Sequence, residues 1–184
     1  MAHLSEQSTG RTASILNFLV TITLAVLFLI YFSIMAYTKD ALWFYPVFDA
    51  MPAQIMIRCY GKQIALESDS EHLTNIAGMV NGQISGDKRW DELNLTDPTY
   101  QDYQTTTSMM ILELSYSEPQ RIHSQSPFFS GFTTLLIPLD GRYSNTNIMF
   151  ALRNGKPAGG SFHVQSFGAV RAYIEDNDLC TKKP

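Results

Sequence analysis

Cysteine is scarce in this 184-residue chain, and the two that are present are too few for a disulfide-dense scaffold or a four-thiolate zinc site. Charge is scarce too, because Asp, Glu, Lys and Arg make up 16% of the residues, against about 25% in an ordinary domain. The 13 Lys and Arg are outnumbered by 17 Asp and Glu, so the chain lacks the positive field that phosphate backbones attract. We therefore expect no nucleic-acid partner.

Motifs for catalysis or ligand binding are also missing. There is no HxH, HExxH or Cys-x-x-Cys pair for a metal and no GxSxG nucleophile elbow. Segment 154–161 holds three glycines, but its spacing is wrong for a P-loop, so we interpret it as a long hairpin connection. The carboxylates of segment 87–102 lack the order of a calcium loop. The sequence predicts neither a metal nor a cofactor.

The missing charge is concentrated in one place, because residues 12–38 include no Asp, Glu, Lys or Arg. Within this run, residues 15–37 form an apolar stretch of 23 residues, and a helix of that length crosses a hydrocarbon layer of roughly 30 Å. The alternative of a buried core helix is disfavoured, since such a helix normally carries a polar stripe. We predict a short N-terminal tail over 1–14 and one transmembrane helix over 15–37.

A cleaved signal peptide is the second alternative for this run. It would have a basic start, a short apolar core and small residues before the cut. Here Arg11 is the only Lys or Arg before the run, the apolar stretch is too long, and Ile34 stands where a small residue should lie if cleavage followed Ala36. We therefore expect the lipid bilayer to be a permanent partner of the chain.

An aromatic cluster follows the predicted span, within a juxtamembrane segment over 38–50. Trp43, Phe44 and Tyr45 are amphipathic or apolar rings of the kind that gather at the membrane interface, so we predict that they lie there. The alternative is a docking surface for another membrane protein. Lys and Arg are distributed too evenly around the span to fix its orientation. An apolar segment so near the start favours an uncleaved export signal, with the C-terminal domain extracytoplasmic.

A globular domain is predicted over 51–184, where short alternating runs replace the long apolar one. Strands are expected at 54–60 and 63–67, joined by a type II′ turn at Gly61-Lys62. Ser68 and Glu71 form a capping-box pattern that begins an amphipathic helix ending at Gly86.

An irregular, exposed acidic loop is expected next, over 87–104, and then strands joined by short turns and a closing helix. The strands are predicted at 107–116, 121–125, 132–139, 147–153 and 161–165, and the helix at 167–179. The predicted fold class is α+β: a single N-terminal transmembrane helix, then a mainly antiparallel β-sheet with two packed helices in the order ββα-βββββ-α.

Cys59 and Cys180 leave two alternatives open. If the domain is extracytoplasmic, a disulfide between them would close a loop of over a hundred residues. Two free, inert thiols fit the sequence equally well.

Three histidines belong to the predicted domain. His72 falls in the first turn of its helix and is expected to be solvated, whereas His123 and His163 fall within predicted strands, where a hydrogen-bonded structural histidine is the commoner case.

The sequence favours a single-pass, membrane-anchored, non-catalytic interaction protein. We expect an accessory subunit of a membrane complex or an envelope binding or sensing module, with a membrane or envelope protein as its partner. The alternative is a membrane-anchored hydrolase that uses His123 or His163 with a serine or an acid that folding brings near. An anchored domain that binds lipid or peptide is a third class.

Overall fold

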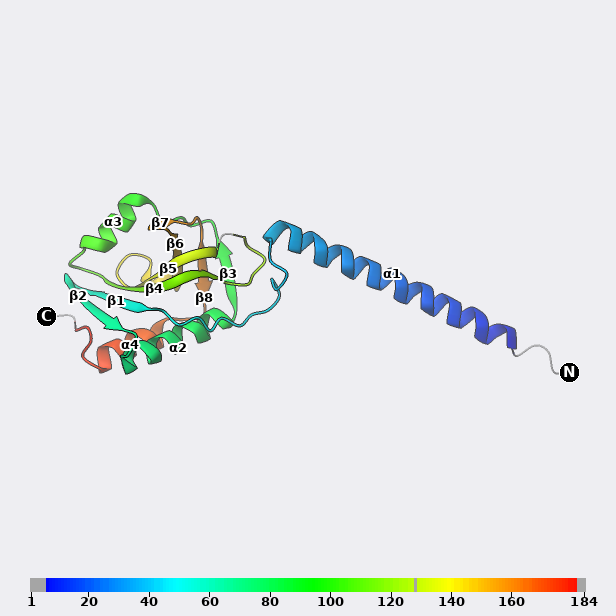
Figure 1. Cartoon of the computed structure of the whole chain (residues 1–184), viewed down its shortest axis with the longest axis horizontal. Coiled ribbons are helices and arrows are strands. Elements are labelled where there is room, and N and C mark those ends of the chain that lie inside the picture. The colour runs from blue at the N-terminus through cyan, green and yellow to red at the C-terminus, as the bar shows by residue number, and fades with distance from the viewer. Residues whose placement is uncertain (1–5, 128, 182–184) are drawn as a thin grey trace. The chain divides into compact units, whose positions relative to one another are not determined.

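The computed structural model describes residues 6–127 and 129–181, and the chain forms two compact units that divide between Trp43 and Phe44 (Figure 1). The first unit is helix α1, Glu6–Thr38, of which Ser14–Thr38 is long and apolar enough to cross a membrane. Its apolar side chains are exposed along the span, including Leu16 at 62% and Leu29 at 69%. The helix begins nine residues before the predicted span, because adding polar residues to an existing helix requires no new nucleus.

The second unit is built on one antiparallel sheet of eight strands (Figure 1). The strand order is β2-β1-β4-β5-β6-β8-β3, with the short β7 paired to β6. The strands are β1 (Gln54–Cys59), β2 (Lys62–Glu67), β3 (Lys88–Asp91), β4 (Met110–Arg121), β5 (Ser130–Asp140), β6 (Ile148–Arg153), β7 (Lys156–Pro157) and β8 (Ser161–Val164). The predicted α+β class is confirmed.

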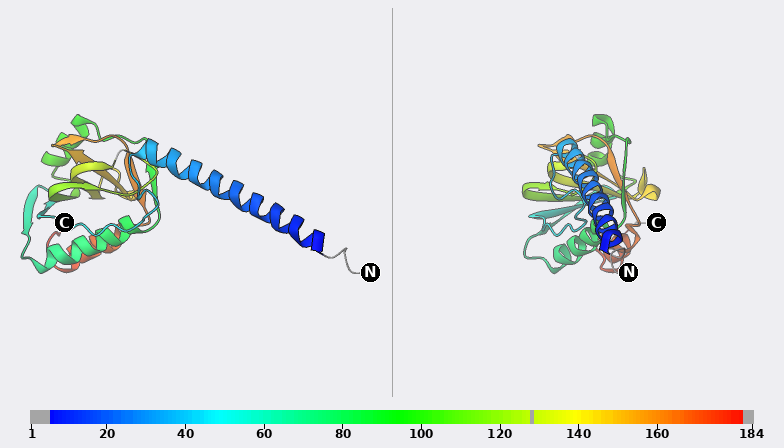
Figure 2. Two further views of the ribbon diagram at one scale, coloured as in Figure 1. Left: turned by 45° about the vertical axis from the view of Figure 1, so that its right-hand side comes forward. Right: turned by 90° about the vertical axis from the view of Figure 1, so that its right-hand side faces the viewer.

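Helices cover both faces of this sheet. On one face α2 (Glu71–Ser85) and α4 (Gly168–Asp176) lie side by side, while α3 (Asp97–Thr105) lies over the opposite face (Figures 1 and 2). Alternation along the strands separates two apolar layers, so that Leu112 packs beneath α2 and α4 and its neighbour Ile111 packs on the α3 side. The larger layer is rich in aromatic rings, with Phe129 and Phe162 at a centroid distance of 4.4 Å.

The predicted acidic loop over 87–104 is wrong. Residues 88–91 form the edge strand β3, which pairs with β8, and residues 97–105 form α3. The N-cap of α3 is Thr96, whose hydroxyl accepts from the Thr99 N–H at 3.3 Å, and Pro98 occupies the first turn, where a missing N–H costs nothing. The loop was predicted from the charged residues of this segment. The Thr96 cap and Pro98 start a helix there despite those charges.

The sequence predicted separate strands at 107–116 and 121–125 with a turn between them, but β4 continues through Glu118 and Pro119 to Arg121. Pairing between β4 and β5 shifts register between Ser115 and Gln120, so Pro119 lies at an irregularity where its missing N–H interrupts no ladder. The strand predicted at 121–125 does not form, and His123 lies in the connection that follows β4.

Two local predictions at the start of the domain also need correction. The loop of the β1–β2 hairpin is Tyr60-Gly61, not Gly61-Lys62, and both residues have positive φ, 45° and 91°, as a type I′ turn requires. Helix α2 begins at Glu71 with Ser70 as its N-cap, so Ser68 does not cap it.

The segment before β1 belongs to the domain, although the sequence predicted the domain from residue 51. Phe48 is 6% exposed, and its ring lies 6.3 Å from that of Phe132 in the core. Helix α2 holds the backbone here: the Phe48 N–H donates to the Ser85 hydroxyl at 2.9 Å, and the Asn81 amide donates to the Ala50 carbonyl at 3.0 Å. Residues 48–50 therefore belong to the domain, and hydrogen bonds hold them against α2, its longest helix.

Candidate functional site

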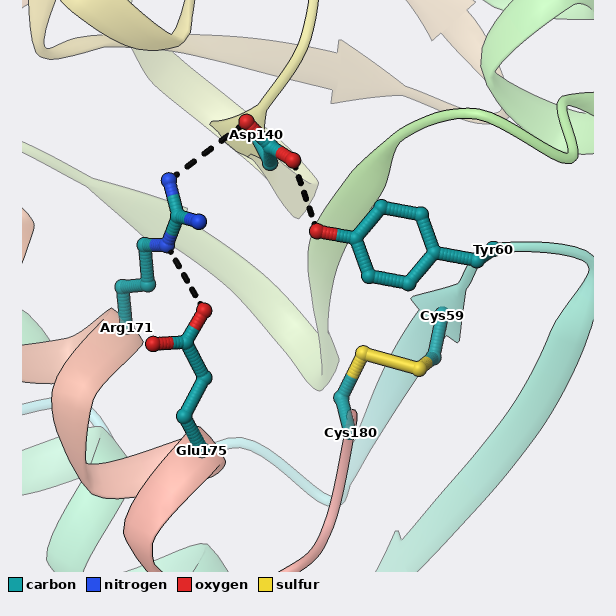
Figure 3. The surroundings of a disulfide bond; sticks show 6 residues. All are labelled: Cys59, Tyr60, Asp140, Arg171, Glu175 and Cys180. Atoms are coloured by element: carbon teal, nitrogen blue, oxygen red, sulfur yellow. Dashed lines mark hydrogen bonds and ion pairs between the residues drawn. A yellow bond between two sulfur atoms is a disulfide. The ribbon is translucent and has the colours of Figure 1, made fainter. Parts of the chain in front are cut away.

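A disulfide joins the first strand to the end of the chain. Cys59 is the last residue of β1, and Cys180 follows α4; their sulfur atoms are 2.05 Å apart and they are separated by 121 residues (Figure 3). Both side chains are buried, at 4% and 2% exposure. Of the two alternatives left by the sequence, the structure has the bridge.

A polar cluster lies beside this disulfide, and it spans three elements (Figure 3). Tyr60, in the β1–β2 turn, donates its hydroxyl to Asp140 at the end of β5 at 2.6 Å. Arg171 of α4 lies 3.4 Å from the other Asp140 oxygen, and its Nε donates to Glu175 at 2.9 Å. Together with the disulfide, this cluster fastens α4 to one end of the sheet.

The protonation of Tyr60 decides what the cluster can do. Burial, followed by the hydrogen bond and the negative charge of Asp140, raises the pKa of Tyr60 from 10.0 to about 12. The phenol therefore keeps its proton at neutral pH and serves as a donor. These properties fit a structural contact between α4 and the sheet, since Tyr60 would need a lowered pKa to act as a base or a nucleophile.

Arg171 also lines a shallow cleft of about 210 Å³. It is lined by Pro138, Leu139, Ser144, Asn145, Asn147, Ser166, Phe167, Gly168 and Arg171. The Asn147 side-chain oxygen accepts from the Phe167 N–H at 3.2 Å, and the Ser166 hydroxyl accepts from the Gly168 N–H at 3.0 Å. The cleft is smaller than the roughly 300–1,000 Å³ of typical small-molecule sites. Its one cation is already balanced by Asp140 and Glu175.

His163 is the better placed of the two histidines that the sequence nominated for catalysis. It lies on β8, where Nδ1 is 2.9 Å from the Thr146 carbonyl oxygen and Nε2 is 3.2 Å from an Asp91 carboxylate oxygen. A carbonyl oxygen can only accept, so Nδ1 carries a proton, and the remaining nitrogen faces the carboxylate. The Nδ1 contact thus links β8 to the turn before β6, while Nε2 lies buried beside Asp91 of β3 without a hydrogen bond.

The other two histidines of the domain lie apart from this site. The His123 ring lies edge-on to Tyr45 at a centroid distance of 6.3 Å. His72, predicted to be solvated, has its Nδ1 3.0 Å from the Tyr173 hydroxyl of α4, which also accepts from Asn75. His72 therefore helps to join α2 to α4.

A charged pair lies under α3 and was not predicted. Arg58 on β1 and Glu113 on β4 are 3.0 Å apart with side chains 14% exposed, and the Gln104 amide of α3 lies 3.5 Å from the same carboxylate oxygen. These contacts provide hydrogen-bond partners for the polar side chains at the edge of the apolar layer beneath α3. Both donors converge on the same carboxylate oxygen, so the arrangement ties β1 and α3 to β4.

The predicted membrane-interface residues fall on both sides of the division between the two units. Trp43 ends the first unit, and Phe44 begins the second. Phe44 and Tyr45 are 58% and 47% exposed, so both rings are available to lipid or to another protein.

Comparison with protein-family models, curated proteins and solved structures finds no match to this chain. Within residues 6–127 and 129–181, no three His, Cys, Asp or Glu side chains are grouped so that they could hold a metal ion.

Proposed function

We propose that this protein is a single-pass membrane-anchored interaction protein, either a small accessory subunit of a membrane complex or an envelope binding or sensing module. The observation that carries the proposal is the apolar helix Ser14–Thr38, whose side chains are exposed, followed closely by a compact domain. An exposed apolar surface of this length is stable in lipid and costly in water.

The tether between the two units supports a role at the membrane surface. Only residues 39–43 separate the end of α1 from the domain, and a fully extended chain of that length reaches at most about 20 Å. The start of the domain is therefore held within about 20 Å of the end of α1, within reach of partners in the membrane. Exposed Phe44 and Tyr45 at the start of the domain suit contact with headgroups or with the flank of another membrane protein.

The disulfide supports an extracytoplasmic domain. Such bonds persist in oxidising compartments and are rare where glutathione keeps thiols reduced. The Cys59–Cys180 bridge is buried in the core of the domain, and no other cysteine is present in the chain to exchange with it.

The rival proposal is a membrane-anchored hydrolase that uses His123 or His163. The 3.2 Å contact between His163 and Asp91 is the observation in its favour, since a carboxylate beside an imidazole orients a general base. Against it, Nδ1 is held by the Thr146 carbonyl, and Nε2 is buried beside the Asp91 carboxylate, where no serine or other nucleophile of the described residues is hydrogen-bonded to it.

Protease protection tests the anchor and its orientation. We expect the full chain to stay with the membrane after alkaline extraction, and protease added to intact cells to remove the domain. The control is the same digestion after permeabilisation, which should cut the domain in either orientation. Release by alkali would contradict the anchor, and full protection in intact cells would reverse the orientation.

Mild-detergent purification tests the interaction role. We expect a membrane or envelope protein to co-purify in fixed proportion, and a matched chain with Phe44 and Tyr45 both changed to Ser to recover less of it. A chain that elutes with no other protein would remove the accessory-subunit version.

A further inference from the structure

Strand β2 forms one edge of the sheet, and it is the exposed one. Within the described residues β2 pairs with β1 alone, and four of its six residues are exposed: Lys62, Gln63, Ala65 and Glu67. The opposite edge, β3, has only four residues and carries Lys88, Arg89 and Asp91. A row of unpaired backbone groups on an exposed edge is a template for another strand.

The hydrogen bonds of the neighbouring strand reveal which backbone groups of β2 point outward. The Tyr60 N–H donates to the Met109 carbonyl at 3.1 Å, toward β4. Backbone groups alternate in direction along a strand, so Cys59, Ile57 and Ile55 point toward β2 and bond with Lys62, Ile64 and Leu66. The residues whose N–H and C=O groups face outward are therefore Gln63, Ala65 and Glu67.

We propose that β2 pairs antiparallel with β2 of a second copy of this chain, about a two-fold axis through Ala65. Each Ala65 then faces the other, and Gln63 of each copy faces Glu67 of its partner, all through outward-pointing backbone groups. On the other face Ile64 lies opposite the partner's Leu66. The sequence of the edge is thus complementary to itself.

The charges of β2 also favour a second copy of this chain as its partner. The exposed charges of β2 are Lys62 at one end and Glu67 at the other. Antiparallel pairing places the positive end of each strand beside the negative end of its partner, and the Gln63 amide can donate to the partner's Glu67. Parallel pairing would bring like charges together.

Symmetry and the layers of the sheet fix the register. A two-fold axis normal to the sheet maps each face onto itself, so paired residues must lie on the same face. An axis through Ile64 also meets this condition, but it would oppose Lys62 to Leu66 and leave Glu67 opposite the hairpin turn. The axis through Ala65 pairs every outward-facing residue of β2.

The dimer is closed and depends on the anchor. Both β2 edges are used, and the short, charged β3 edge offers no continuation, so the contact forms no open filament. One strand pair buries little surface, which makes association weak in solution. Confinement of both copies to one membrane raises their effective concentration and compensates for this.

Cysteine crosslinking of the full chain in its membrane tests the proposal. In a hydrogen-bonded antiparallel pair the Cα atoms are about 5.5 Å apart, within the range of a disulfide, so Ala65→Cys should give a reducible dimer of this chain. The matched control is Gln63→Cys, equally exposed, whose two copies would lie four residues apart along the strands and should crosslink far less.

Each outcome is decisive. A reducible homodimer for Ala65→Cys with little for Gln63→Cys supports the proposal, whereas equal crosslinking at both positions or none at either overturns it. A mixed disulfide between Ala65→Cys and a different protein also overturns it and assigns the edge to a foreign strand. That last result would leave the membrane-anchored interaction role intact, so the two proposals fail separately.

A second variant tests the backbone directly. Ala65→Pro removes an outward N–H that β1 does not use, and proline is tolerated on a sheet edge. We expect energy transfer between labelled full-length copies in liposomes to fall to the background of unrelated anchored chains, while the circular dichroism of the variant stays that of the wild type. Unchanged energy transfer would overturn the pairing.

Discussion

Tyr60 performs two tasks that depend on one backbone position. Its φ of 45° closes the β1–β2 turn immediately after Cys59, and its hydroxyl reaches across the end of the sheet to Asp140. The disulfide and the Tyr60 hydrogen bond therefore begin at adjacent residues, and they lead to Cys180, which follows α4, and to Asp140, which also contacts Arg171 of α4. At the scale of single residues, this is where the C-terminal helix is secured.

Removing the disulfide should be the most costly change to a pair of side chains. The bridge closes a loop with a separation of 121 residues, and loop-closure entropy gives such a bridge about 5 kcal/mol of stability, less any strain. We expect the double variant Cys59→Ala with Cys180→Ala to lose roughly this much in denaturant titrations in detergent. Reduced wild-type chain is the control and should shift similarly; a loss below about 1 kcal/mol would contradict the expectation.

Tyr60→Phe should change the response to alkali. The folded pKa of Tyr60, about 12, lies above the unfolded value of 10.0, so the contribution of its proton is complete below pH 10. It is lost as pH rises from 10 towards 12, since the unfolded chain releases the proton first. We expect wild-type stability to fall more steeply than that of Tyr60→Phe over this range.

The measurement is the difference in denaturation midpoint between the two chains at a series of pH values. The difference should be constant below pH 10 and shrink above it. A difference that stays constant to pH 12 would show that Tyr60 titrates alike in both states.

At the scale of elements, the connection between β7 and β8 requires a glycine for two reasons. Gly160 has φ of +68°, and a Cβ there would collide with the Trp90 indole nitrogen and lie 2.9 Å from the Asp91 carbonyl oxygen. Its N–H donates to the Asn94 side chain at 2.5 Å. The glycine therefore lets this connection pack against β3 and the segment that follows it.

Replacing each of two glycines with alanine distinguishes the free-energy cost of backbone strain from the cost of a steric collision. Gly155 has φ of +74° but open space around it, so Gly155→Ala should cost about 1–2 kcal/mol, the strain of a left-handed residue. Gly160→Ala should cost roughly 1–3 kcal/mol more, because the collision adds to that strain. Thermal or denaturant unfolding of both variants checks this, and equal losses would refute the packing argument.

The elements that the sequence predicted well are those with a local signal. Helix α2 follows from apolar residues such as Leu73 and Ile76 at helical spacing, and β1 and β2 follow from alternation on either side of a glycine. Strand β3 could not be found in this way, because it is short and charged and forms only by pairing with β8 far along the chain. Strand β4 was divided at Pro119, since a register shift is invisible until its partner is known.

The candidate site was less predictable than the fold. Tyr60, Asp140 and Arg171 are distant in sequence and follow no motif, and only the end of the sheet brings them together. For His163 the prediction of a hydrogen-bonded structural histidine agrees with its contacts to Thr146 and Asp91. His123 was expected in a strand and lies in a connection instead.

At the scale of the whole molecule, the domain should be separable from helix α1 without loss of stability only if the cut lies before Phe48. A chain covering 44–184 keeps Phe48 in the core and its hydrogen bonds to Ser85, whereas one covering 51–184 loses them. We expect both to be oxidised and folded, with the shorter chain less stable by roughly 3–5 kcal/mol, the cost of deleting a buried Phe.

The control for this truncation is Phe48→Ala in the chain covering 44–184, which should reproduce most of the loss. Denaturant unfolding of the three chains provides the comparison. If the two lengths were equally stable, the segment before β1 would be a linker and not part of the domain.

The covalent path through the molecule has a consequence for proteolytic shedding. Residues 59–180 form a ring closed by the disulfide, so nearly every exposed loop of the domain lies inside it. A single cut in any of these loops leaves both fragments covalently attached to helix α1. Separation of the domain from α1 therefore requires cleavage within residues 39–53, between α1 and β1, or a cut inside the ring combined with reduction of the bridge.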